Sequence, residues 1–297
     1  MEIVHRRASL AAGAEVTLEV NPEDVSARNV REWRAAGINR LSIGVQSFQD
    51  HVLSWMHRTH DALAAHRAIA TAREGGVENL SVDLIFSLPS VVNRDWPRDL
   101  DAALALDLPH LSVYGLTVEP RTPLGRWVAR SDLAEAPDET FESEFLLAHE
   151  ALSAAGFDHY EVSNFGRARR HSRHNWAYWT RALYAGLGPS AHEFDGAQRR
   201  WNVSAFAEWS ARALANGSCV DGAEQLDATQ IEAEEIYLGL RTAQGVSKTE
   251  RDEVRVSEWI DAGWAAPTSD ATVKLIAMGW LRIDALAVGL TQGRSRY

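Results

Sequence analysis

The chain has 297 residues, of which 41 are acidic and 30 are basic, so its formal net charge is −11. Hydrophobic residues make up 45% and charged residues 24%, a globular composition that argues against disorder, while the acidic balance argues against nucleic-acid binding. No apolar window reaches the roughly 20 residues of a transmembrane helix, and the N-terminus lacks a signal-peptide pattern, so we expect a cytoplasmic protein.

Short apolar strands alternate with helices over the first two thirds of the chain. Strands are predicted at residues 15–20, 40–46, 79–88, 110–118 and 159–164, and helices at 27–36, 61–74, 96–106 and 139–155. Asn21 and Ser26 are expected to cap the turn and the helix that follow the first strand. This alternation predicts βαβ units and a parallel sheet buried on both faces. Because no strand precedes a dinucleotide-type glycine loop, we expect a barrel-like arrangement.

The pattern changes near residue 201. Beyond it the sequence predicts helices only, among them 231–241 and 257–262, before a small helix-and-strand unit at 272–288. We therefore expect two domains, a (βα) barrel over residues 1–205 and a small, mainly helical C-terminal domain over residues 206–297.

Polar residues stand at the predicted ends of the strands, where barrels of parallel strands carry their chemistry. They are Glu19 and Asn21, Gln46 and Ser47, Asp83, and Thr117. Each alone is explained by an ordinary loop or strand contact. Together they line one mouth, and a shared polar ligand is the better explanation.

Six ordered motifs resemble one known family. They are EVNP at 19–22, GVQSF at 44–48, DLIFSLP at 83–89, YEVSNF at 160–165, HNWAYW at 174–179 and GLGPSAH at 186–192. The set is similar to the radical S-adenosylmethionine (SAM) proteins related to oxygen-independent coproporphyrinogen III oxidase, and within them to the heme chaperones. The resemblance implies an α/β fold, a radical-SAM-type (βα)6 partial barrel whose first two βα units are missing, followed by the small C-terminal domain.

The resemblance also implies SAM-contacting residues. The matching positions are Glu19, Gln46, Arg58 and Asp83, with a weaker match at Thr117 and Ala185. The chemistry agrees with this transfer, because a carboxylate suits the methionyl ammonium, an arginine suits the methionyl carboxylate, and an aspartate suits the ribose hydroxyls.

In similar proteins the HNxxYW motif is associated with heme binding. The candidates here are His174 as the axial ligand, with Asn175, Tyr178 and Trp179 around it and His192 as a second ligand candidate. The neighbouring arginines at 169, 170 and 173 could pair with the heme propionates. The alternative, which the sequence leaves open, is that His174 and Asn175 bond the backbone while the aromatic residues fill the core.

The chain departs from the family in its cysteines. Family members hold a [4Fe–4S] cluster with a CxxxCxxC loop and approach SAM with a GGGTP-type turn, and neither motif occurs here. The single cysteine, Cys219, cannot ligate a cluster alone, so the chain as given is not expected to cleave SAM, and we assign no catalytic or cluster-binding residue. The strand at 15–20 would then form an exposed sheet edge. A destabilised monomer, a partner that supplies the missing strands, and a start site assigned too late remain open, and the undamaged motif spacing favours the last.

The sequence therefore predicts a heme-binding chaperone that hands heme to acceptor proteins, respiratory ones among the candidates, with a homodimer left open. The alternative is a truncated coproporphyrinogen III dehydrogenase-like radical SAM enzyme of porphyrin biosynthesis. A barrel fragment without activity is the third hypothesis.

Overall fold

The computed structural model describes residue 6 and residues 10–268 and 271–295. It consists of two compact units, Met1–Ser172 and Arg173–Tyr297. No helix among the described residues combines the length and the apolar character that crossing a membrane requires.

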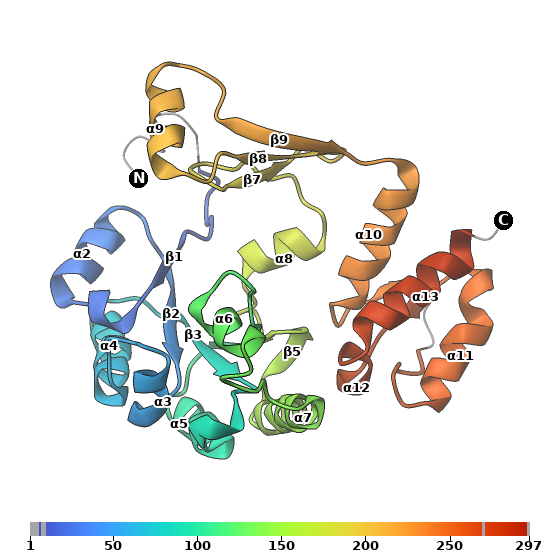
Figure 1. The fold of residues 1–297 in the computed structure, drawn as a ribbon, viewed down its shortest axis with the longest axis horizontal. Coiled ribbons are helices and arrows are strands. Elements are labelled where there is room, and N and C mark those ends of the chain that lie inside the picture. Colours follow the sequence, from blue (N-terminus) through green and yellow to red (C-terminus); the bar gives the residue numbers. More distant parts are fainter. Residues whose placement is uncertain (1–5, 7–9, 269–270, 296–297) are drawn as a thin grey trace. The chain divides into compact units, whose positions relative to one another are not determined.

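A six-stranded sheet in the order β1-β2-β3-β4-β6-β5 organises the N-terminal unit (Figure 1). Its first four strands are mutually parallel: β1 (Thr17–Val20), β2 (Arg40–Gln46), β3 (Asn79–Phe86) and β4 (His110–Gly115). This confirms the predicted βα alternation. The remaining two strands, β5 (Asp158–Glu161) and β6 (Asn164–Gly166), are antiparallel to each other, and β6 is antiparallel to β4.

The prediction of one continuous strand at 159–164 is wrong, because the chain reverses direction between Glu161 and Asn164. The Ser163 amide donates to Glu161 Oε2 over 3.3 Å, and the Asn164 side-chain amide donates to Glu161 Oε1. A buried acceptor within the turn thus replaces the ladder bonds that a straight strand would make.

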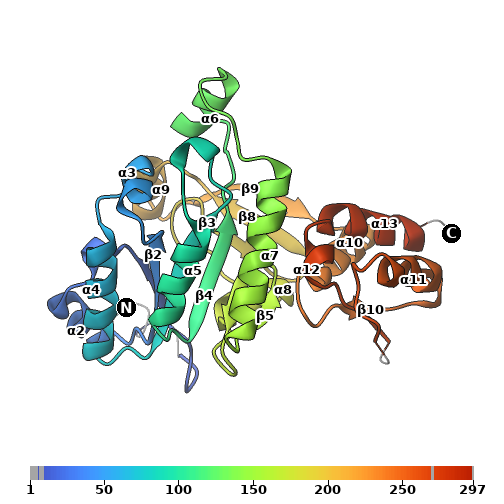
Figure 2. The ribbon, with the colours of Figure 1, turned by 90° about the horizontal axis from the view of Figure 1, so that it is seen from below.

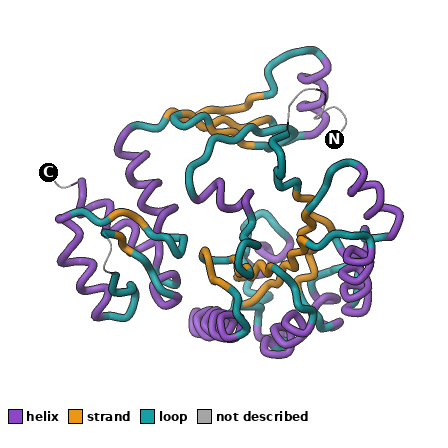
Figure 3. Tube along the Cα trace, turned by 180° about the vertical axis from the view of Figure 1, so that it is seen from behind, coloured by secondary structure: helices purple, strands orange, loops and turns teal. Residues whose placement is uncertain are grey.

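Helices cover one face of this sheet (Figure 3). They are α2 (Ala27–Ala35), α3 (Asp50–Trp55), α4 (Ala62–Glu74), α5 (Trp96–Ala105) and α7 (Asp138–Ala154), with short 3₁₀ turns at Pro22–Asp24 and Ser90–Val92. As predicted, Ser26 caps α2 by accepting from the Asn29 amide over 3.1 Å. Asp61 caps α4 in the same way. The prediction of an Asn21 cap is wrong, since the Asn21 side chain makes no capping bond.

As expected, both faces of the sheet are largely buried over β2, β3 and β4, but only one of them is apolar. Alternate residues such as Leu41, Ile43, Leu80, Val82, Leu84 and Leu111 are fully buried against the helices. Burial of each such side chain stabilises the fold by about 2 kcal/mol. The intervening residues Arg40, Ser42, Ser81, His110 and Ser112 are polar and form the other face. The strands follow the period of two typical of a sheet with one apolar face.

Buried hydrogen bonds join several side chains of this polar face. His110 is fully buried; its Nδ1 lies 2.7 Å from the Ser81 hydroxyl and 3.4 Å from an Arg40 nitrogen, and its Nε2 lies 2.8 Å from the Tyr160 hydroxyl. Because a guanidinium only donates, Nδ1 is the acceptor and Nε2 carries the proton. Burial, together with the charges of Arg40 and His171, holds the pKa of His110 well below its usual value. His110 is therefore a neutral structural group at physiological pH.

The C-terminal unit begins with α8 (Arg173–Trp179) and continues with a three-stranded antiparallel sheet of β7 (His192–Phe194), β8 (Gln198–Asn202) and β9 (Val220–Gln225). The helix α9 (Phe206–Leu214) connects β8 to β9. The prediction of helices only after residue 201 is wrong at β9, whose polar and small residues have little strand propensity and are mostly exposed. The expected division between residues 205 and 206 falls inside this hydrogen-bonded sheet.

A small helical bundle completes the C-terminal unit. It contains α10 (Ala228–Leu240), α11 (Glu253–Asp261), α12 (Ala277–Trp280) and α13 (Ile283–Ser295), a 3₁₀ turn at Glu250–Asp252, and a short ribbon of β10 (Val246–Ser247) and β11 (Thr272–Val273). The last part agrees with the predicted helix-and-strand unit at 272–288. The core of this bundle contains Ile236 and Leu240 from α10 and Leu290 from α13, and all three side chains are completely buried.

Candidate functional site

A cavity of about 310 Å³ lies at the carboxyl ends of the parallel strands. Gln46 from the end of β2, Ile85 from β3 and Leu116 from beyond β4 border it, and the short helix α6 (Pro123–Ala129) contributes Leu124 and Trp127. Figure 2 shows α6 standing beyond this end of the sheet. The remaining lining residues are Trp55, Met56, His57, Arg58, Thr122 and Pro123. A mostly apolar cavity with a few polar groups is the usual form of a small-molecule site.

Arg58 brings a positive charge to this cavity. Its Nη2 donates to Asn21 Oδ1 over 2.6 Å and to the Gly44 carbonyl over 3.0 Å, and its buried Nε has no hydrogen-bond partner. Among the described residues no carboxylate forms an ion pair with Arg58. An arginine held by neutral acceptors keeps its charge available for an anionic ligand.

Gly44 allows three polar side chains to meet over β2. A Cβ at this position would lie 2.9 Å from Gln46 Nε2, 3.5 Å from Arg58 Nη2 and 3.8 Å from Asn21 Oδ1. Any larger residue would therefore push Gln46 aside. Asn21, expected as a helix cap, instead positions Arg58.

Gln46 adopts an uncommon backbone conformation, with φ at 71°. Non-glycine residues rarely enter this left-handed region, and those that do are concentrated at binding sites. No hydrogen bond to the Gln46 side-chain amide forms within the described residues, so both its donor and its acceptor remain available to a ligand.

Asp83 places a carboxyl group on the polar face of β3. Ser42 Oγ donates to Asp83 Oδ1 over 3.0 Å. Burial raises the pKa of Asp83 to about 6, the nearby charge of Glu19 acts in the same direction, and hydrogen bonds from Ser42 and Ser112 oppose the rise. A partly buried carboxyl with hydroxyl neighbours suits recognition of ligand hydroxyl groups.

The other predicted contacts are placed differently. Glu19 is exposed on β1, electrostatically close to Asp83, and Thr117 is exposed in the loop after β4. Ala185 is an exposed residue of the C-terminal unit. The N-terminal unit thus brings Gln46 and Arg58 to one cavity and Glu19 close to Asp83.

The heme candidates belong to the C-terminal unit. His174 and Tyr178 are exposed on α8, with ring centres 4.9 Å apart in an edge-on arrangement, and Tyr178 makes a similar contact of 4.8 Å with Tyr184. Asn175 is partly exposed beside them. An exposed histidine against an aromatic ladder has the donor chemistry of a heme ligand.

The other two heme-site candidates, Trp179 and His192, already contact neighbouring side chains. The Arg241 guanidinium stacks on Trp179, 4.8 Å from the ring centre, and the buried indole N–H has no partner among the residues that the structure describes. One face of the Trp179 ring is thus already covered. His192 is exposed at the start of β7, and its ring lies 6.0 Å from that of Trp201.

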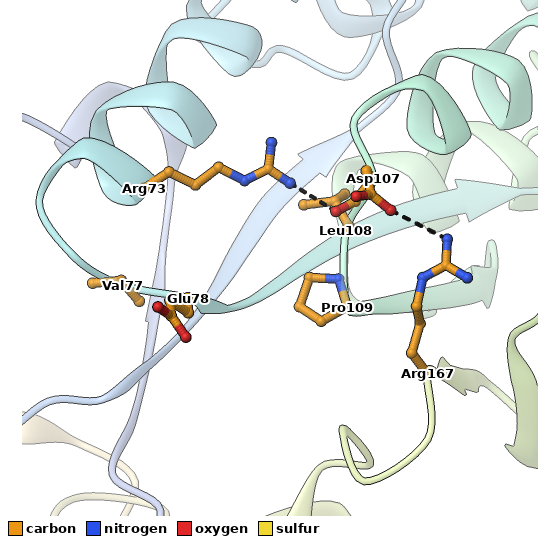
Figure 4. A pocket seen from close by; sticks show the side chains of 7 residues that line it. All are labelled: Arg73, Val77, Glu78, Asp107, Leu108, Pro109 and Arg167. Carbon is orange, nitrogen blue, oxygen red and sulfur yellow. Dashed lines mark hydrogen bonds and ion pairs between the residues drawn. The ribbon is translucent and has the colours of Figure 1, made fainter.

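A larger groove of about 490 Å³ lies at the opposite edge of the parallel strands (Figure 4). Arg73 donates to the carbonyls of Leu106 and Asp107, and Arg167 donates to Asp107 Oδ1 over 3.3 Å and to the Ala155 carbonyl over 2.9 Å. Arg73 and Arg167 thus hold the loop that leads into β4, and Arg167 also holds the end of α7. At the amino ends of parallel strands such contacts stabilise the fold.

Sequence patterns missed several residues of the site. Ser42 and Ser112 bond Asp83, and Trp55 and Trp127 supply the aromatic walls of the cavity. The period-two alternation of polar residues along residues 40–46 and 110–114 could have identified the serines. Trp127 had no comparable signal, because only the fold returns α6 to the strand ends.

The chain is similar to proteins of one known superfamily. The family model "Radical SAM superfamily" matches residues 1–103. "Heme chaperone HemW" from Bacillus subtilis is 35% identical over 235 residues, which cover 79% of this chain and 62% of that protein. The chain belongs to the radical SAM superfamily. The mouse "Radical S-adenosyl methionine domain-containing protein 1, mitochondrial" is 34% identical over 295 residues, 96% of this chain and 66% of that protein. The chain thus spans less than two thirds of the length of these curated relatives.

A solved structure supports the same superfamily fold. The structure titled "Coproporphyrinogen III oxidase (HemN) from Escherichia coli is a Radical SAM enzyme" matches with a TM-score of 0.77 at 19% identity, over 97% of this chain and 72% of that chain. This similarity confirms the predicted α/β fold class.

Membership of the superfamily implies that SAM and a [4Fe–4S] cluster are bound. The residues of this chain fit SAM but do not fit the cluster. Within the part of the chain that the structure describes, the side-chain amide of Gln46 has no hydrogen-bond partner and Arg58 has no ion-pair partner. Together with the partly buried Asp83 they fit a ligand with carboxylate and hydroxyl groups. Cys219, the single cysteine, is half-buried near the Trp209 carbonyl, and no cluster of three metal-ligating side chains occurs among the described residues. These residues do not fit a three-thiolate cluster.

Proposed function

We propose that this chain is part of a heme-binding chaperone that delivers heme to acceptor proteins and descends from radical SAM enzymes. The observation that carries the proposal is the 35% identity to "Heme chaperone HemW" over 79% of the chain. The proposed partners are heme and heme-accepting proteins, including respiratory ones. We place the protein in the cytoplasm and propose that it assembles as a homodimer.

His174 is the proposed axial ligand. Its exposure on α8 gives heme access to the imidazole, and Tyr178 against it offers an aromatic wall. Asn175 and Trp179 would shape the same site, and His192 is the second candidate. Arg173, exposed at the start of α8, suits a heme propionate.

SAM is the second proposed ligand, held in the N-terminal unit. Arg58 would pair with its carboxylate, Glu19 with its ammonium and Asp83 with its ribose hydroxyls, while Gln46 would bond through its side-chain amide. Thr117 would add a further contact from the loop after β4. SAM, when bound, supplies a sulfonium group. No reaction of SAM is proposed, because the residues of this chain do not fit the cluster that would reduce it.

Hemin titration of the purified chain tests the heme proposal. We expect a Soret shift that saturates near one heme per chain and is lost in His174→Ala. His57→Ala removes an equally exposed histidine of the N-terminal unit, so it should titrate like the unaltered chain. Absence of a Soret shift would overturn heme binding, whereas a shift that survives His174→Ala but not His192→Ala would move the ligand to β7.

A further inference from the structure

Two loops border the proposed SAM site, and both begin in strained backbone. β2 ends at Gln46 with φ at 71°, and the residue after β3, Ser87, has φ at 59°. Neither is a glycine, so the surrounding structure must hold each of them in the left-handed region.

Asp99 of α5 holds the first loop. Its carboxylate accepts from the Ser47 hydroxyl at 2.9 and 3.0 Å and from the Phe48 amide at 2.7 Å. Asp99 is completely buried, so these bonds replace its lost hydration. The carboxylate therefore fixes the two residues that directly follow Gln46.

Glu144 of α7 holds the second loop. Its Oε2 accepts from the Ser87 amide over 2.6 Å, and its backbone carbonyl accepts from the Trp96 indole N–H over 2.9 Å. The Ser87 amide is thus fixed by a charged acceptor, which makes a stronger bond than a neutral one.

Arg94 joins the two carboxylates. Its Nη2 donates to Glu144 over 2.9 Å, and its Nη1 lies 3.5 Å from Asp99 Oδ2 and donates to the Ile85 carbonyl over 2.7 Å. Its side chain is 2% exposed and stacks over Trp96 at 4.3 Å. One planar guanidinium therefore links both loops to β3, two residues beyond Asp83.

We propose that Arg94, acting through Asp99 and Glu144, is a positioning residue that sets the distance between the Gln46 and Asp83 ends of the site. This proposal rests on the proposed SAM site. Lysine cannot replace arginine here, because an ammonium lacks the fork that reaches three acceptors from fixed directions.

Arg73 provides a matched control for Arg94. It also donates to loop backbone, at the Leu106 and Asp107 carbonyls, but at the opposite edge of the same sheet (Figure 4). Arg73→Lys removes the same planar guanidinium but changes no contact at the strand ends that border the cavity.

The experiment compares Arg94→Lys, the milder Glu144→Gln and the control Arg73→Lys in the full chain. Hydrogen exchange is measured at Phe48 and Ser87, and SAM binding is measured by calorimetry at a temperature where every variant is folded. We expect faster exchange at both amides in Arg94→Lys, at Ser87 in Glu144→Gln, and a SAM affinity at least fivefold weaker in both. Arg73→Lys should change neither quantity.

Unchanged SAM affinity in Arg94→Lys, or unchanged exchange at Phe48 and Ser87, would overturn the positioning role. An equal loss of affinity in Arg73→Lys would also overturn it, because the effect would then be one of general stability. If the unaltered chain binds no SAM, the proposed SAM site itself fails, and the role of Arg94 toward SAM fails with it.

Discussion

Asp83 is a partly buried carboxyl whose ionisation the fold opposes, so replacing it with asparagine should stabilise the protein at neutral pH. Burial raises its pKa from 3.8 to about 6, with Ser42 and Ser112 opposing the rise and Glu19 adding to it. Because the folded pKa is the higher one, the native state retains a proton that the unfolded state releases. The resulting stabilisation is complete below pH 3.8 and is lost as the pH rises through about 6.

The size of this effect follows from the two pKa values. Their difference corresponds to about 3 kcal/mol of unfolding free energy once Asp83 is ionised. Asparagine has nearly the same shape, can accept the Ser42 bond through its carbonyl oxygen, and never ionises. Asp83→Asn should therefore be more stable than the unaltered chain by up to about 3 kcal/mol at pH 7.5 and by about half of that at pH 5.

Urea unfolding followed by circular dichroism at these two pH values measures the difference. Asp107→Asn is the matched control, because Asp107 has a side chain 88% exposed at the other edge of the sheet and should change stability little at either pH. Equal or lower stability of Asp83→Asn at pH 7.5, or a difference that does not depend on pH, would refute the reasoning. The same variant should bind SAM less tightly, as expected where a binding residue costs stability.

Three further predictions concern the C-terminal unit. Arg294→Ala should lower the unfolding free energy by about 3 kcal/mol at pH 7 in urea melts, because it strips a buried partner from Asp252. Burial opposes the ionisation of Asp252, but the bonds from Arg294 and Thr249 keep its pKa below 3.8, so this deficit should shrink as the pH falls through the lowered pKa. Gly245→Ala should cost at least about 2 kcal/mol in thermal melts, because φ is 74° and a Cβ would overlap the Val273 carbonyl. Trp280→Phe should cost about 1–2 kcal/mol, because it leaves the Leu240 carbonyl without its indole donor, and an unchanged melting temperature would contradict this.

Local signals predicted most of the N-terminal unit. Residues 40–46 form a strand with the predicted bounds, and the helices capped by Ser26 and Asp61 begin where the caps indicate. These elements were predictable because a capping bond and an apolar repeat involve residues only a few positions apart.

Elements that depend on distant partners were not predictable in the same way. The turn between β5 and β6 forms because β6 pairs with β4, about 50 residues earlier in the chain. The strand β9 gains its order from pairing with β8 across α9. The association of Arg58 with Asn21, 37 residues apart, likewise depends on the tertiary fold. Strand and site contacts of this kind carry no local pattern.

Several features of the proposed SAM site lower the stability of the fold. The left-handed conformation of Gln46 costs on the order of 1 kcal/mol, Arg58 retains a partly buried charge without a counterion, and Asp83 ionises against its burial. A glycine at position 46 would remove the backbone strain, and a neutral side chain at position 58 or 83 would remove the unfavourable charge. None of these three destabilising features is therefore required to form the sheet. In sheets of parallel strands ligands bind at the carboxyl edge for reasons of topology alone. Topology and local instability are independent criteria, and both select Gln46, Arg58 and Asp83 as the residues that a ligand would contact.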